Sequence, residues 1–123
     1  MLRKILLLIL LTFSMCAYDF GNIPKVSLVD IPKGERLMIQ FGKTKCIWCE
    51  HMAPYLKEIK DKNPEVAIYY INTDKDILGG INAGVEVLPT SIFWDEYGKE
   101  IGRHEGYLLP EEIMELLKKY KLL

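Results

Sequence analysis

The apolar and polar positions along the chain alternate between short apolar runs and amphipathic stretches. Apolar runs rich in β-branched and aromatic residues, and bounded by glycine, proline or polar residues, are typical of buried strands. Three such runs predict strands at residues 36–41, 66–72 and 90–94, and a weaker run predicts a short strand at 26–29. A turn at 95–99, which contains Gly98, predicts a further strand at 100–104. Pro89 marks either the start of the strand at 90–94 or an edge position, because proline cannot donate a hydrogen bond inside a central strand.

Two stretches have helical periodicity and a third is weaker. One helix is predicted from residue 49 to about 62, because apolar side chains recur there on one face; this face carries Trp48, Met52, Tyr55, Leu56 and Ile59. The closing helix starts at Pro110, which suits a first helical turn, and its buried stripe is Ile113, Leu116, Leu117 and Tyr120. Residues 74–85 contain three glycines and allow at best a short helix ended by Gly84.

This order of strands and helices predicts an α/β domain, with helices packed on a mixed central sheet. The 123 residues fit one domain. The 16 basic and 17 acidic residues nearly cancel, which argues against binding nucleic acid or an anionic membrane through bulk charge. We therefore expect no nucleic-acid partner, and we expect a monomer.

Residues 1–17 differ from the rest of the chain. Arg3 and Lys4 precede an apolar run from residue 5 to about 13, and small residues follow. A basic start, a short apolar run and a cleavage zone are typical of an export signal, and the run is shorter than the ~20 residues needed to span a bilayer. We expect a signal peptide at 1–17, a domain at 18–123 and a periplasmic or otherwise extracytoplasmic location. An uncleaved membrane anchor and lipidation of Cys16 are the alternatives, although Met15 precedes Cys16 where lipoprotein signals have a small residue.

Removal of the signal would leave Cys46 and Cys49 as the only cysteines. Small exported domains held together by disulfides are cysteine-dense, so this single pair indicates chemistry. Cys46 follows a predicted strand and Cys49 falls in the first turn of a predicted helix, where unpaired amides stabilise a thiolate. We expect Cys46 to attack a disulfide and Cys49 to resolve the mixed disulfide.

Other uses of the pair are weaker. Haem attachment needs a histidine directly after the second cysteine, and Glu50 stands there before His51. A structural zinc site needs four ligands, and only His51 and His104 could join the cysteines. An inert disulfide closing so small a loop would stabilise the fold little. We expect no metal.

From about Val26 to Tyr120, the chain resembles the thioredoxin family. The resemblance is carried by "LMIQFGKTKCIWCEHMAPYLKEI", "VAIYYINTD", "GVEVLPTSIFW" and "YGKE". Four features coincide: the Cys-x-x-Cys at a helix start, Pro54 five residues after it, Leu-Pro-Thr before a strand, and Gly106 before the last helix. The resemblance implies a thioredoxin-like fold in which a cis Leu88–Pro89 bond faces the cysteines. It also implies that clients contact Ile47, Trp48, Leu88, Pro89 and Thr90, although Trp48 could equally be packing on its helix.

The chain departs from the family at three places. Cytosolic thioredoxins have Trp-Cys-Gly-Pro-Cys, whereas this chain has Ile47 and Trp48 between the cysteines. The buried aspartate that the family carries six residues before the first cysteine is Gln40 here, and its lysine partner aligns with Tyr70. Deprotonation of Cys49 is therefore left to Glu50, His51 or a water molecule.

The expected function is an exported thiol–disulfide oxidoreductase that reduces disulfides in client proteins. It would need an electron donor, such as a membrane thiol transporter, and no cofactor, because no nucleotide-binding glycine motif is present. A periplasmic oxidase or isomerase is the first alternative, since direction depends on reduction potential. A non-catalytic peptide-binding module, with a cleft around Trp48, Leu88 and Thr90, is the second.

Overall fold

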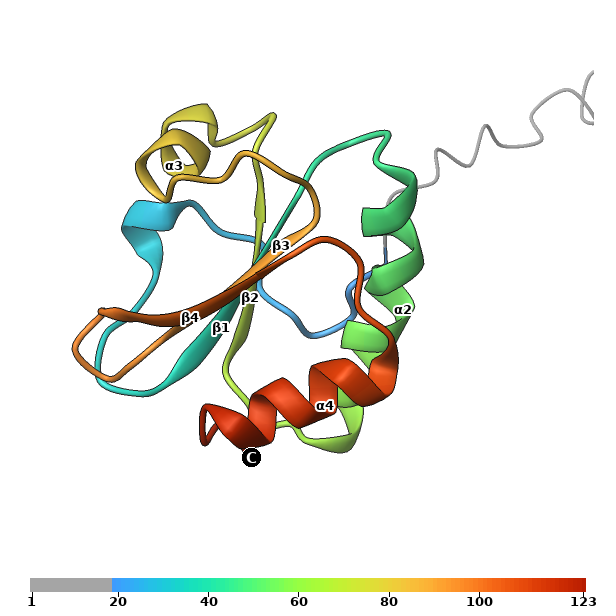
Figure 1. The fold of residues 1–123 in the computed structure, drawn as a ribbon, viewed down its shortest axis with the longest axis vertical. Coiled ribbons are helices and arrows are strands. Elements are labelled where there is room, and N and C mark those ends of the chain that lie inside the picture. Colours follow the sequence, from blue (N-terminus) through green and yellow to red (C-terminus); the bar gives the residue numbers. More distant parts are fainter. Residues whose placement is uncertain (1–18) are drawn as a thin grey trace, which may run out of the picture.

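A four-stranded sheet with helices on both faces organises the chain (Figure 1). The structure, a computed structural model, describes residues 19–123. The expected signal peptide at 1–17, with Cys16, lies outside the described residues.

The strands are the four main ones that the sequence predicts, with small shifts at their ends. They are β1 (Leu37–Gly42), β2 (Ile68–Asn72), β3 (Thr90–Trp94) and β4 (Glu100–Glu105), in the order β2-β1-β3-β4. The β1–β2 pair is parallel, while β3 is antiparallel to both β1 and β4. Parallel neighbours need a crossover connection, and the long helix after β1 provides it. The mixed sheet of the expected fold is confirmed.

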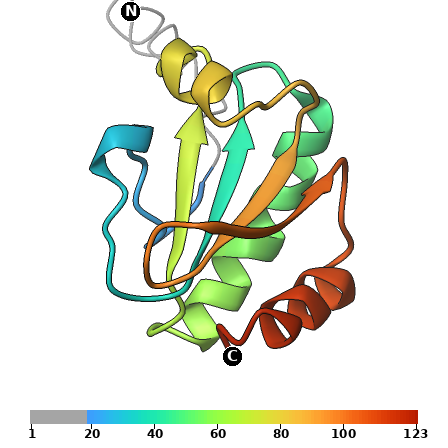
Figure 2. The same ribbon diagram turned by 60° about the vertical axis from the view of Figure 1, so that its left-hand side comes forward.

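The helices divide between the two faces of the sheet (Figure 2). On one face lie α2 (Ile47–Lys62), which continues through Pro54, and α4 (Pro110–Lys119). The short 3₁₀ helix η1 (Leu28–Asp30) and α3 (Ile77–Asn82) lie on the other face. No helix within residues 19–123 has the length and apolar character required to cross a membrane.

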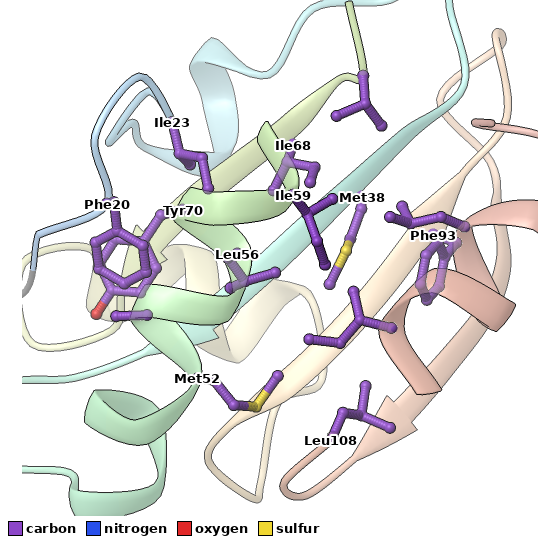
Figure 3. Packing of buried hydrophobic residues seen from close by; sticks show 14 residues of the cluster. Phe20, Ile23, Met38, Met52, Leu56, Ile59, Ile68, Tyr70, Phe93 and Leu108 are labelled. Atoms are coloured by element: carbon purple, nitrogen blue, oxygen red, sulfur yellow. The ribbon is translucent and has the colours of Figure 1, made fainter. Parts of the chain in front are cut away.

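Successive side chains along each strand point to opposite faces of the sheet, so the sheet has a hydrophobic core on each face. The side chains that face α2 and α4 form the larger cluster (Figure 3), which includes Met38, Met52, Leu56, Tyr70 and Phe93. The other face buries Leu37, Ile39, Phe41, Ile71 and Ile92. Because β1 contributes to both cores, all six of its residues are buried, which rigidly fixes the strand that leads to the cysteine pair.

The expected strand at 26–29 is wrong. Pairing with β2 is limited to one bridge between Lys25 and Tyr70. The chain then turns into η1, where the Leu28 amide donates to the Asp76 carboxylate at 2.8 Å. The same carboxylate caps α3 through the Gly79 amide. Asp76 thus draws the segment toward α3, and the backbone cannot continue as a strand.

Candidate active site

Cys46 and Cys49 form a disulfide at the start of α2, with their Cα atoms 5.2 Å apart. Residues 43–45 alone separate Cys46 from the end of β1. Cys46 is the N-cap, and its Sγ accepts a hydrogen bond from the Cys49 amide at 3.2 Å. That amide and the positive end of the helix favour a thiolate on Cys46 when the pair is reduced.

The two sulfurs differ in access. Cys46 is 9% exposed and Cys49 is 3% exposed. The neighbours Ile47 and Trp48 project outward and are 62% and 54% exposed. Cys46 is therefore the more accessible of the two sulfurs, whereas Cys49 lies deeper.

The sheet below Cys49 carries buried polar side chains. Gln40 in β1 is 2% exposed; its Oε1 accepts a hydrogen bond from Ser91 Oγ at 2.6 Å, and its Nε2 donates to Met52 Sδ at 3.9 Å. Gln40 satisfies its polar atoms without a charge, so this position, occupied by an acid in cytosolic thioredoxins, needs no cation partner.

Gly42, the last residue of β1, lets two side chains approach closely. A Cβ at Gly42 would lie 2.9 Å from Tyr70 Oη and 3.3 Å from Cys49 Sγ. The phenol of Tyr70 and the sulfur of Cys49 thus share the space beside this glycine. The sequence gives no direct sign of this packing, because it depends on how β1 and β2 pair.

Trp48 lies against other aromatic rings. Its ring centroid is 5.2 Å from that of Tyr107 and 5.6 Å from that of the exposed His51. Tyr107 and Tyr55 join their hydroxyl oxygens in a hydrogen bond of 2.8 Å. That bond, followed by burial, raises the pKa of Tyr107 to about 12. We name Trp48, Tyr55 and Tyr107 the aromatic strip.

Tyr107 is a residue that sequence reasoning missed. It directly follows Gly106, the glycine before the last helix, which could have directed attention to it. Trp48 was expected to share the apolar face of α2, but the helix turns its ring mostly toward solvent and against Tyr107.

Leu88 and Pro89 lie in the loop before β3, and this loop is at the same end of the sheet as the loop before α2 (Figure 1). The Leu88–Pro89 peptide bond is cis. Thr90 pairs with Phe41 near the end of β1, and the Pro89 carbonyl accepts from the Gly106 amide at 2.7 Å. Thr90 is 1% exposed and its hydroxyl donates to the Val87 carbonyl. Of this predicted set, Leu88 is half-buried, while the side chains of Pro89 and Thr90 are buried.

The ionisable side chains next to the pair in sequence are accessible to solvent. Lys43, Lys45, Glu50 and His51 are all exposed. His104, the other histidine considered as a zinc ligand, lies in β4 opposite Ser91. Within residues 19–123, no three side chains of histidine, cysteine, aspartate or glutamate come together as a metal site.

Comparisons with known proteins agree with this arrangement. A family model described as "Thioredoxin-like domain" matches residues 30–121. Thioredoxin-like protein R548 of Acanthamoeba polyphaga mimivirus is 38% identical over 79 residues, which cover 63% of this chain and 56% of that protein. Thioredoxin-like 3-1, chloroplastic, of Arabidopsis thaliana is 29% identical over 89 residues, which cover 68% of this chain and 42% of that protein. The chain thus spans about half the length of these relatives.

Solved structures share the fold. Mitochondrial thioredoxin 3 of Saccharomyces cerevisiae, in its oxidised form, has a TM-score of 0.70 at 24% identity, covering 81% of this chain and 97% of that chain. Thioredoxin of Fasciola hepatica has a TM-score of 0.66 at 24% identity, covering 72% of this chain and 83% of that chain.

Proposed function

Because the chain belongs to the thioredoxin-like family, we propose that it is a thiol–disulfide oxidoreductase in which Cys46 attacks and Cys49 resolves. The observation that carries this proposal is the position of the pair. Cys46 caps α2 and accepts from the Cys49 amide, while Cys49 is buried one turn deeper.

The reaction has two steps. The Cys46 thiolate attacks one sulfur of a client disulfide, so that a Cys46–client disulfide forms and the other client sulfur leaves as a thiolate that takes up a proton. Cys49 then loses its proton and attacks Cys46 Sγ. The Cys46–Cys49 disulfide forms, and the client leaves with both cysteines reduced.

We expect clients to bind along the edge of the sheet that holds the pair. Ile47 and Trp48 offer exposed apolar surface on one side of Cys46. Leu88 is the accessible part of the segment Leu88–Thr90 on the other side. Clients are proteins with cysteines, and a membrane thiol protein would return electrons to the pair, because the chain carries no nucleotide-binding glycine motif of its own.

Export belongs to the same proposal. It is supported by the basic and apolar character of residues 1–17. Expression in a Gram-negative host, followed by fractionation and N-terminal sequencing, tests it. A periplasmic protein that starts near Ala17 or Tyr18 is expected, whereas a cytoplasmic protein that keeps Met1 would contradict export.

Catalysis is tested by the reduction of insulin with dithiothreitol, followed by turbidity. The full chain is expected to accelerate precipitation, and the variant Cys46→Ser is not. Equal rates for both proteins would overturn the oxidoreductase and favour a peptide-binding module.

Direction is a separate measurement. The reduction potential of the pair can be followed through the emission of Trp48 in dithiothreitol or glutathione buffers. We expect a value near about −270 mV, typical of a reductant. A value between about −180 and −120 mV would identify an isomerase or oxidase instead.

A further inference from the structure

The resolving step requires Cys49 to become a thiolate in a buried place. Burial alone raises the pKa of a thiol, because it disfavours the charged form. Cys49 is 3% exposed. Gln40 does not supply a charge, and its amide donates to Met52 Sδ. Another group must therefore stabilise the thiolate of Cys49.

Tyr70 is the buried titratable side chain that reaches this place. It is 3% exposed, and its ring stacks on Phe20 with centroids 4.1 Å apart (Figure 3). This stacking fixes the ring, and β2 aims it at the carboxyl end of β1. Tyr70 Oη and Cys49 Sγ both lie within 3.3 Å of the point where a Cβ on Gly42 would stand.

The other titratable groups around Tyr70 and Cys49 are more accessible, apart from Cys46 itself. They come from the loop before α2, from α2 and from the segment that carries Phe20. All are exposed or partly exposed: Lys43, Lys45, Glu50, His51, Lys57, Asp19 and Lys25. Tyr70 differs from this set in being buried beside Cys49, where a hydrogen bond is not weakened by competition with water.

We propose that the Tyr70 hydroxyl donates a hydrogen bond to the Cys49 thiolate during the resolving step. This inference rests on the proposed function. The phenol keeps its proton throughout. The proton of Cys49 leaves to water, the thiolate attacks Cys46 Sγ, the Cys46–client bond breaks, and the client sulfur takes up a proton from water.

The Tyr70 hydroxyl would thus assist the ionisation of Cys49, as a buried acid does, but by donating a hydrogen bond. A hydrogen bond to the charged form of a group lowers the pKa of its acid. The Tyr70 hydroxyl therefore offsets the burial of Cys49 without placing a second charge in the core, which would be costly.

The test separates the two steps with 5,5′-dithiobis(2-nitrobenzoate), on the full chain carrying Cys16→Ser so that only the pair reacts. Attack by the reduced Cys46 releases one thionitrobenzoate at a rate that depends on reagent concentration. Resolution by Cys49 releases the second at a rate that does not. The variants are Tyr70→Phe, which keeps the ring on Phe20, and the control Tyr69→Phe, whose ring packs on the other face of the sheet.

We expect Tyr70→Phe to slow the second release about tenfold at neutral pH and to raise its pH midpoint by about one unit. The first release and the Tyr69→Phe control should match the parent. An unchanged second release in Tyr70→Phe would overturn the inference. A slower second release with an unchanged pH midpoint would also overturn it, because a displaced Cys49 would react slowly at every pH. A first release no faster than in Cys46→Ser would overturn the proposed function itself.

Discussion

Ser91 donates a hydrogen bond of 2.6 Å to Gln40 across the antiparallel β1–β3 pair, beneath the helix that carries the cysteines. Both side chains are buried. A neutral amide at this place can satisfy its donor and acceptor with Met52 and Ser91, whereas a carboxylate would bring a charge. The hydrogen bond between these two neutral side chains thus links β1 and β3 beneath the cysteine pair without a buried charge.

Gln40→Glu tests this arrangement with little change in shape. Burial raises the pKa of the new carboxyl above its unfolded value of about 4.3. Stability should match the parent most closely below that pH and fall as pH rises through the raised pKa, because the folded state then binds more protons than the unfolded state. We expect a loss of about 3 kcal/mol at pH ~7 for a shift of about two units, measured by urea unfolding of the disulfide form.

Gln40→Leu is the matched control. It removes the same hydrogen bonds and leaves Ser91 without this partner, at a cost of about 1–3 kcal/mol that does not depend on pH. If the stability of the glutamate and leucine variants depended on pH in the same way, the site would not disfavour a buried charge, which would contradict the account.

Gly42→Ala tests the close approach of the Tyr70 and Cys49 side chains to Gly42. The added methyl would lie 2.9 Å from Tyr70 Oη, so one of the neighbours must move. Overpacking of this kind costs about 1–3 kcal/mol, which chemical denaturation would measure. A Tyr70→Phe background should relieve only part of this cost, because it removes Oη but keeps Cε2, which lies 3.0 Å from the added methyl. A variant as stable as the parent would show that the space beside Gly42 is open.

The hydrogen bond between Tyr55 and Tyr107 should be visible in a titration. The pKa of Tyr107, which is raised to about 12, should fall toward about 10 in Tyr55→Phe. Since the folded pKa lies above the unfolded one, the stability from this pair is present below pH ~10 and is lost as pH rises toward about 12. NMR of the tyrosine rings, assigned with Tyr107→Phe, reports the midpoint. If the midpoint of Tyr107 stays the same in Tyr55→Phe, the hydrogen bond between the two hydroxyls is contradicted.

Trp48→Ala tests the aromatic strip as client surface. Insulin reduction should fall about three- to tenfold, because exposed contact area beside Cys46 is lost. The first release from 5,5′-dithiobis(2-nitrobenzoate) should not change, since so small a reagent needs no platform. The control variant is Tyr97→Ala, which removes an exposed aromatic ring from the turn between β3 and β4. Equal losses with both reagents would mean that Trp48 acts on Cys46 rather than on the client.

Sequence patterns were sufficient for β1, β2, β3 and the long helices, because each has an apolar pattern of its own. β4 has only one apolar residue, and it could be predicted from the turn at Gly98 that follows β3. The prediction of a short strand at 26–29 was wrong because the Leu28 amide donates a hydrogen bond to the Asp76 carboxylate, 48 residues away in the chain. The cysteine pair could be recognised from spacing and from the start of α2. Three features depend on contacts between elements distant in sequence, and no local pattern encodes them: the position of Tyr107, the Gln40–Ser91 bond, and the approach of both Tyr70 and Cys49 to Gly42.

The most direct test of the account is a trapping experiment with insulin and the reduced full chain carrying Cys16→Ser. With Cys49→Ser added, the resolving thiol is absent, so a disulfide between Cys46 and insulin should accumulate and be mapped by mass spectrometry. With Cys46→Ser added instead, the buried Cys49 should trap little. Equal adducts from both variants, or adducts from Cys46→Ser alone, would contradict the assignment of Cys46 as attacker and Cys49 as resolver.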